Sequence, residues 1–233
     1  MKLTPEKIQQ LYQFTRQHYV EWYDLQTELV DHLANSIETQ WQVNPKISFE
    51  DALQIEFKKF GIFGFMNVVE QRQAALGKKY NQLVWQHFKT FFTIPKIIGT
   101  LVIYAITIQC LYKFEQAYLI FGSIMILSTI AFWYKMYQLN QKNKSEIQIS
   151  GKKWLFKDII YSFSAFGGIS ALPFQLGMNI IEKTNSNWFS ATYIGFFFIT
   201  FLLFEYIVLI LIPSKTDEYL KATYPEYVLE NAN

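Results

Sequence analysis

The chain has 233 residues, of which 21 are Lys or Arg and 19 are Asp or Glu, so that its formal net charge is only +2. This charge excludes a nucleic-acid binder driven by bulk charge, and a single cysteine, Cys110, excludes a secreted disulfide scaffold. The content of 51% hydrophobic and 18% aromatic residues is unevenly placed: apolar residues stand at helical spacing up to Lys89, but form long uncharged runs beyond Lys96. The sequence therefore joins a segment typical of a small helical domain to one typical of a membrane protein.

The first 79 residues predict several short amphipathic helices. Thr4 and Pro5 form a typical helix start, with a hydroxyl at the cap and proline at the first helical position. Ser48 with Asp51 three residues later predicts a capping box for a later helix, and Gly61 is placed to end that helix. We expect a small cytoplasmic helical domain over residues 1–79.

One of these helices has an acidic face. Between Gln17 and Gln40 there are five acidic residues and no lysine or arginine. At about 100° per residue the acids fall within roughly a third of the helix circumference, opposite a broad apolar stripe. We expect this face to bind a cytoplasmic partner protein through Glu21, Asp24, Glu28 and Asp31.

The same face contains the best candidate for a metal site. Glu28 and His32 lie one helical turn apart, with Glu21 or Asp24 nearby, and a carboxylate and an imidazole at this spacing can share a cation. A convincing site needs three or four ligands, so we favour a solvated acidic face and expect no metal and no cofactor. The sequence contains no GxSxG, no glycine-rich phosphate loop and no HExxH. We therefore expect no enzymatic activity.

A family resemblance covers roughly residues 5 to 75. The segment Glu-Leu-Val-Asp-His-Leu from Glu28 to Leu33, then Ile47–Ala52 and Phe60-Gly61, resembles the helix-turn-helix-associated α-helical signalling (HAAS) domain found beside PadR-type regulators in bacteria. The whole chain is similar in layout to multi-pass membrane proteins of Bacteroidetes. The resemblance implies a cytoplasmic module that relays or docks and has no catalysis of its own.

Four segments after this domain are apolar enough to predict transmembrane helices. A membrane-spanning helix needs about 20 mostly apolar residues, because the hydrocarbon core is roughly 30 Å thick. Aromatic residues alternating with lysine predict an interfacial linker helix over 80–95. The four predicted spans cover about 96–113, 116–137, 156–181 and 188–213.

The distribution of lysines predicts the orientation of these spans. The connection from Lys135 to Lys157 contains six lysines, and short cytoplasmic loops are enriched in positive charge. Both chain ends are then expected in the cytoplasm, the C-terminal one as a tail over 214–233. The six lysines could instead recognise acidic lipid head groups, although the positive-inside bias alone is enough to explain them.

Two polar residues stand out inside the predicted spans. Glu205 lies about 7 to 8 Å to the cytoplasmic side of the middle of the fourth span, where an unpaired carboxylate is costly. Ser164 lies at similar depth in the third span, which Pro173 and Gly177 should kink. Glu205 is either a polar contact between helices or the proton or cation site of a small transporter.

The sequence thus predicts an all-α protein with a small cytoplasmic helical domain followed by a four-helix transmembrane bundle. We expect it in the bacterial inner membrane as a signalling or scaffolding protein that contacts the lipid bilayer and a cytoplasmic protein. Direct nucleic-acid binding is not expected, whereas a homo-oligomer would fit. The alternative is a small transporter or channel built around Glu205 and the broken third span.

Overall fold

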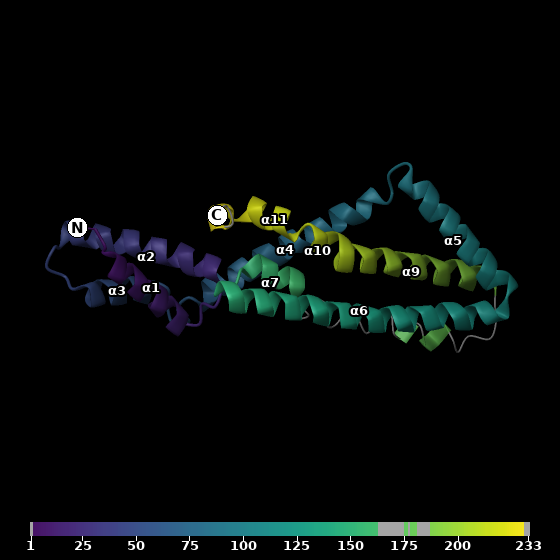
Figure 1. The fold of residues 1–233 in the computed structure, drawn as a ribbon, viewed down its shortest axis with the longest axis horizontal. Coiled ribbons are helices and arrows are strands. Elements are labelled where there is room, and N and C mark those ends of the chain that lie inside the picture. Colours follow the sequence, from purple (N-terminus) through teal and green to yellow (C-terminus); the bar gives the residue numbers. More distant parts are fainter. Residues whose placement is uncertain (1, 163–174, 177, 181–186, 231–233) are drawn as a thin grey trace. The chain divides into compact units, whose positions relative to one another are not determined.

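The computed structural model describes residues 2–162, 175–176, 178–180 and 187–230, and regular structure in these residues is helical throughout. The predicted all-α class is confirmed (Figure 1). The helices are α1 (Pro5–Gln17), α2 (Tyr23–Val43), α3 (Phe49–Lys58), α4 (Met66–Thr90), α5 (Lys96–Lys113), α6 (Glu115–Ser150), α7 (Leu155–Tyr161), α9 (Trp188–Tyr206), the π-helical turn η1 (Ile207–Leu211), α10 (Ile212–Ser214), α11 (Thr216–Thr223) and α12 (Pro225–Glu230).

The helices form two compact units. The N-terminal unit consists of Met1–Lys78 together with two later segments, Glu146–Asp158 and Leu220–Asn233. The apolar unit consists of Lys79–Ser145 and Ile159–Tyr219. Helix α4 is continuous across the position where the sequence separates a helical domain from a linker helix, and α6, α7 and α11 also contribute residues to both units.

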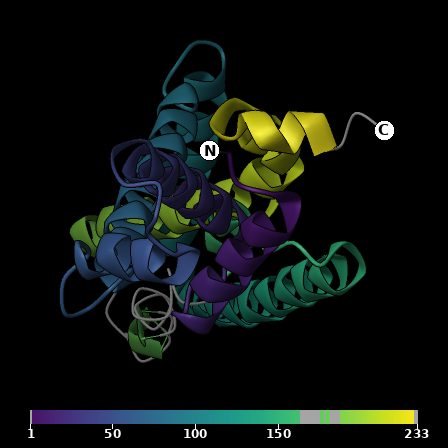
Figure 2. The ribbon, with the colours of Figure 1, turned by 90° about the vertical axis from the view of Figure 1, so that its left-hand side faces the viewer.

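Helix α2 supplies the core of the N-terminal unit. Its apolar stripe recurs every three or four residues, and α1 and α3 pack against it, as the two views in Figures 1 and 2 show. The acidic side of the helix is left outside this core, as its sequence pattern predicts. The buried apolar residues of α2 are Leu25, Leu29, Val30, Leu33, Ile37 and Trp41.

Helix α3 begins and ends where its sequence predicts. The Ser48 hydroxyl oxygen accepts the backbone N–H of Asp51 at 3.0 Å and donates to the Asp51 carboxylate at 2.7 Å. Gly61 follows the helix with φ +77°, a left-handed conformation that glycine adopts without strain. Gly64 also has a positive φ, of +54°, and lies against the ring of Phe57. Two glycines therefore shape the connection to α4.

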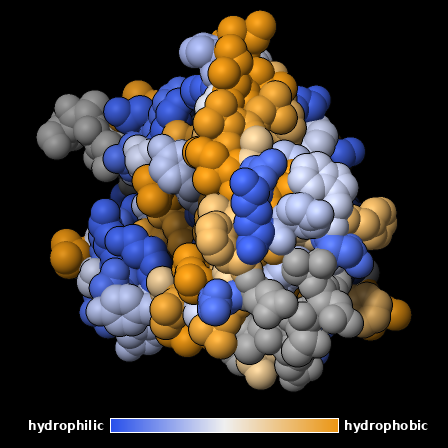
Figure 3. Space-filling view, turned by 90° about the vertical axis from the view of Figure 1, so that its right-hand side faces the viewer, coloured by the Kyte–Doolittle hydropathy of each residue, from blue (hydrophilic) through white to orange (hydrophobic). Residues whose placement is uncertain are grey.

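Three helices of the structure are long and apolar enough to cross a membrane. These are α5, then α6 from Gln116 onward, and α9 with its continuation to Ser214. Helices α5 and α9 pack together, and much of the outer surface of the three helices is apolar, as Figure 3 shows for one face. Their shared core, to which Ile180 also belongs, contains Ile108, Leu111, Ala117, Tyr118, Met125, Ala191, Ile194 and Phe198.

Two of these helices match the bounds of predicted spans, and one is longer. Helix α5 covers 96–113, and α9 with η1 and α10 covers 188–214. Helix α6 does not stop near residue 137 but continues through the lysine-containing polar segment to Ser150, because that segment holds no proline and no glycine before Gly151. Most of the predicted third span, 156–181, lies outside the described residues, as does its polar residue Ser164.

Candidate functional site

The acidic side of α2 faces residues of its own chain. Glu21 lies just before the helix, and its carboxylate accepts a hydrogen bond from Lys153 Nζ at 2.9 Å. One oxygen of Asp24, in the first turn, accepts the backbone N–H of Leu155 at 3.0 Å. Glu28 forms an ion pair with Arg72 of α4. Three of the four acids predicted to bind a partner are thus in contact with this chain itself.

Asp31 differs from the other three acids. Its side chain is exposed, and it forms no ion pair within the ranges that the structure describes. Because it lies one turn after Glu28, it extends the acidic side of the helix beyond the part that the chain covers. Asp31 is therefore the acid of this face that is most open to a partner.

The residues that cover the start of α2 come from the segment after α6. We call Lys152–Asp158 the strap; it follows Gly151, whose φ is +68°. The backbone N–H of Tyr23 donates to the carbonyl of Lys153 at 2.7 Å. The indole N–H of Trp22 donates to the carboxylate of Asp158 at 3.2 Å. The strap is thus joined to α2 by backbone and side-chain hydrogen bonds at both of its ends.

Trp154 is the centre of the strap. Its side chain is only 7% exposed and is surrounded by the ring of Tyr23 at 5.4 Å and the rings of Tyr224 and Tyr227 at 5.2 and 5.1 Å between centroids. The hydroxyl oxygen of Tyr224 accepts the backbone N–H of Phe156 at 3.1 Å. Three distant parts of the chain therefore meet in one aromatic cluster, and the C-terminal segment completes it.

The electrostatics of this contact follow from burial and pairing. Burial raises the pKa of Asp24, and this effect exceeds the lowering by its hydrogen bonds with the Leu155 N–H and the Tyr224 hydroxyl. Burial opposes the charged form of Lys153, but its hydrogen bond with Glu21 and the charge of Asp158 outweigh burial and raise its pKa. Asp24 thus carries its charge at a cost, whereas the charge of Lys153 is stabilised.

The strap contains three of the six lysines of the connection that is expected to be cytoplasmic. Lys153 Nζ lies 3.4 Å from a carboxylate oxygen of Asp158, and Lys157 pairs with Glu146 at 2.5 Å. The ammonium of Lys152 lies 4.7 Å from the centroid of the Tyr23 ring. These three lysines therefore interact with the protein's own acidic and aromatic side chains.

The residues considered for a metal site have other neighbours. Glu28 pairs with Arg72, and the ring of His32 contacts that of Phe60 with 5.9 Å between centroids. In the described part of the chain, His, Cys, Asp and Glu form no group of three that could hold a metal ion. Among the described residues, Glu28 is therefore part of a charged surface and not of a group of metal ligands.

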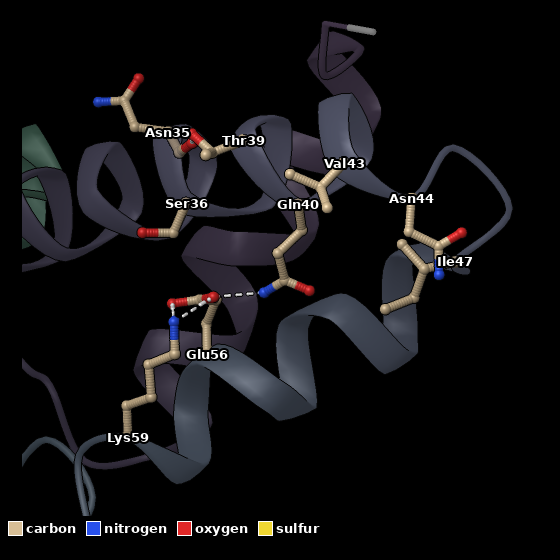
Figure 4. A pocket seen from close by; sticks show the side chains of 9 residues that line it. All are labelled: Asn35, Ser36, Thr39, Gln40, Val43, Asn44, Ile47, Glu56 and Lys59. Atoms are coloured by element: carbon tan, nitrogen blue, oxygen red, sulfur yellow. Dashed lines mark hydrogen bonds and ion pairs between the residues drawn. The ribbon is translucent and has the colours of Figure 1, made fainter.

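A groove of about 560 Å³ lies at the other end of α2, between this helix and α3 (Figure 4). At its base lies Glu56, which is only 2% exposed. Its carboxylate accepts a hydrogen bond from the amide of Gln40, and its two oxygens lie 2.7 and 2.9 Å from Lys59 Nζ. The carboxylate is thus neutralised by its own chain, and the groove offers no free charge to a ligand. Glu56 has a sequence signal: it stands at a core position of α3 with a lysine three residues later.

Glu205 is buried in the apolar unit. Its side chain is 8% exposed on α9, and its Oε1 has no hydrogen-bond partner among the described residues. The hydroxyl of Ser128 on α6 interacts with the carboxyl. One residue, Tyr206, separates Glu205 from η1, and π-helical turns inside α-helices occur often at functional sites.

Sequence reasoning identified the acids of α2 but missed what covers them. Trp154, Tyr224 and Tyr227 are aromatic residues in polar segments, and that contrast is the signal that could have marked them. The chain matches no protein-family model, no curated protein and no solved structure.

Proposed function

We propose that this chain is a multi-pass protein of the bacterial inner membrane, with both ends in the cytoplasm, and that its N-terminal unit docks a cytoplasmic protein. Its role is signalling or scaffolding, without chemistry of its own. Three apolar helices support the membrane location. The resemblance of residues 5–75 to the HAAS domain supports a docking role for the N-terminal unit.

The composition of the N-terminal unit supports the topology. Its three segments come before α5, after most of α6, and after α9 with α10. If all three lie on one side of the membrane, the chain crosses it an even number of times. The three candidate helices supply three crossings, so a fourth is needed between Asp158 and Trp188. The sequence predicts a span at about 156–181, most of which falls in that interval.

The contact between the strap and α2 is the observation that carries the docking proposal. In this contact Lys153 pairs with Glu21, and the indole of Trp154 packs among tyrosine rings. The surface therefore binds a basic side chain next to an aromatic one. A partner that presents a basic and aromatic segment would compete with the strap, while Asp31 gives it a further acidic contact. A ligand shifts such an equilibrium by its differential affinity for the open and covered states.

The experiment uses the full chain in mild detergent as bait and identifies co-purifying proteins by mass spectrometry. Glu28→Lys with Asp31→Lys should abolish the recovery of the docked protein, because both changes reverse charge on the exposed part of the face. Lys153→Ala should increase recovery, because it removes the ion pair that holds the strap on Glu21.

The matched control is Glu50→Lys, an equal reversal at an exposed acid of α3 away from the face. It should leave the recovered protein unchanged. The docking proposal fails if the reversal on α2 and the reversal on α3 have the same effect, or if Lys153→Ala lowers recovery.

A second candidate function is a small transporter or channel, and the buried Glu205 favours it. Among the described residues, one oxygen of its carboxyl group has no hydrogen bond, and such a group is costly among apolar helices and is commonly functional there. Glu205→Gln should then abolish proton-coupled or cation flux in vesicles that contain the purified chain, whereas the docking protein should tolerate it. Unchanged flux in the variant would remove this candidate.

A further inference from the structure

The C-terminal end of α4 and the residue after it contact α11 and the last apolar helix. The hydroxyl of Tyr219 on α11 lies 2.6 Å from Nε2 of His87, and the ring of Phe91 meets that of Tyr206 edge-on at 6.1 Å. All four residues belong to the apolar unit. The start of α5 and the end of α10 are therefore close to the same end of α4.

Three lysines border this junction. Lys96 begins α5 and its Nζ lies 5.2 Å from the centroid of Phe91, while Lys89 lies 5.5 Å from the centroid of Trp85. Lys215 directly follows α10, and its carbonyl accepts the backbone N–H of Tyr219 at 3.1 Å. All three side chains are exposed, and they form no ion pair in the described stretches of sequence.

The electrostatics of His87 agree with this geometry. Burial lowers the pKa of the imidazole, and the positive charges of Lys215 and Lys96 lower it further, although Glu218 opposes them. Lys96 and Lys215, which are far apart in the sequence, thus both disfavour the charged form of this imidazole. The junction is a place where positive charges from separate helices converge.

Exposed apolar side chains adjoin these lysines. Ile98, one turn into α5, is 57% exposed, Phe92 is 53% exposed, and Ile210 near the end of the last apolar helix is 55% exposed. A free anion would use only the lysines and would leave this apolar surface uncovered. A ligand that matches both features has an anionic head and hydrocarbon chains.

We propose that Lys96 and Lys215, with the hydroxyl of Tyr219 and assisted by Lys89, form a binding site for the head group of an anionic phospholipid. The lipid's acyl chains lie along the exposed apolar side chains of α5 and of the last apolar helix. The site rests on the membrane location proposed above, but not on the docking role or on Glu205. It differs from the strap, whose lysines face acidic and aromatic groups of the protein.

The experiment measures retained lipid by native mass spectrometry on the full chain, released from nanodiscs that contain equal amounts of phosphatidylglycerol and phosphatidylcholine with identical acyl chains. The wild-type chain should retain phosphatidylglycerol preferentially. Lys96→Ala with Lys215→Ala should weaken that preference by about thirtyfold, since each lysine near a membrane surface contributes about 1 kcal/mol.

Two matched variants separate the site from general charge. Lys113→Ala with Lys144→Ala removes as many positive charges at exposed positions, at the far end of α5 and near the end of α6, and should retain wild-type preference. Lys96→Arg with Lys215→Arg keeps the charges and should also retain it. If either control loses the preference as the alanine variant does, the site is wrong.

Two further outcomes overturn the inference. Equal retention of both lipids by the wild-type chain would show that no anionic head group is selected. Displacement of phosphatidylglycerol by excess inorganic phosphate would show a simple anion site instead of a lipid site. A chain that does not enter nanodiscs at all contradicts the membrane location itself, whereas a chain that enters without lipid preference contradicts only this inference.

Discussion

At the scale of single residues, Trp154 connects the most distant parts of the chain. Its indole is almost fully buried among three tyrosine rings although it belongs to a short connection after α6. An aromatic side chain of this size that is buried in contacts from separate segments stabilises all of them together. The strap therefore depends on this one side chain more than on any single ion pair at the surface.

Trp154→Ala should destabilise the N-terminal unit by about 3 to 5 kcal/mol, the usual cost of replacing a buried aromatic residue with alanine. Equilibrium unfolding of the full chain in urea and mild detergent measures this loss. Trp85→Ala is the control, since Trp85 is 56% exposed, and it should cost about 1 kcal/mol or less. Equal losses for the two variants would show that Trp154 is not buried as described.

Asp24 makes a prediction about pH. Because burial raises its pKa in the folded protein, the folded state binds the proton more tightly than the unfolded state. The free energy of unfolding contributed by Asp24 therefore falls as pH rises above the usual aspartate pKa of about 3.9, until the folded-state pKa is passed. The contribution of Asp24 to the free energy of unfolding is therefore present at acid pH and lost at neutral pH.

Asp24→Asn should remove this loss while its carbonyl oxygen can still accept the Leu155 N–H. The variant should gain free energy of unfolding relative to the wild-type chain as pH rises, which chemical unfolding at several pH values measures. A gain that grows toward acid would contradict the predicted direction. Glu50→Gln, at an exposed position on α3, should show no such trend.

At the scale of elements, the connection between α3 and α4 depends on glycine at one position. Gly64 has a φ of +54°, and a Cβ there would stand 2.9 Å from the Phe57 ring. Phe57 itself packs against the rings of Phe14 and Phe65, with centroids 5.1 and 5.0 Å away, so it has little room to move. Backbone strain and crowding therefore act together.

Gly64→Ala should lower the free energy of unfolding of the N-terminal unit by about 1 to 3 kcal/mol. Gly77→Ala provides the opposite case, because Gly77 lies inside α4 with open space around it and has an ordinary helical backbone. It should stabilise the helix by about 0.5 to 1 kcal/mol. Thermal unfolding of both variants measures the predicted loss and the predicted gain of stability. A Gly64→Ala chain as stable as the wild-type chain would contradict the crowding.

At the scale of the whole molecule, one compact unit is assembled from the beginning, the middle and the end of the chain. Segments that pack together must lie on the same side of any membrane that the intervening helices cross. The proposed topology can therefore be tested without knowing the partner or the function. It requires only that single positions be labelled from one side.

In a Cys110→Ser background, Ser150→Cys at the end of α6 and Val228→Cys in α12 should react with an impermeant maleimide from the same side of sealed vesicles. Gln116→Cys, in the first turn of α6, should react only from the other side. The mass shift of the labelled protein on a gel shows from which side of the membrane each cysteine reacts. If the Ser150→Cys and Val228→Cys variants react from opposite sides, the chain does not cross the membrane an even number of times between these positions.

Several features of the fold follow from sequence because they are local. The apolar stripe of α2 has a 3.6-residue period, and the Ser48 cap and Gly61 act within a few residues of α3. Long uncharged runs likewise predict apolar helices from composition alone. The length of α6 was underestimated because its polar end continues the helix without any apolar pattern to reveal it.

What covers the acidic face of α2 was decided only by tertiary structure. Periodicity predicts that Asp24 lies on the polar side of its helix, but not that Leu155, 131 positions later, donates a hydrogen bond to it. That contact arises because the strap and the C-terminal segment return to the first helices, and such returns depend on how the whole chain folds. The sequence by itself thus determined helical class, apolar helices and an acidic surface, because each is a property of neighbouring residues. Only the tertiary structure could identify Lys153, Trp154 and Tyr224 as the residues that meet the start of α2.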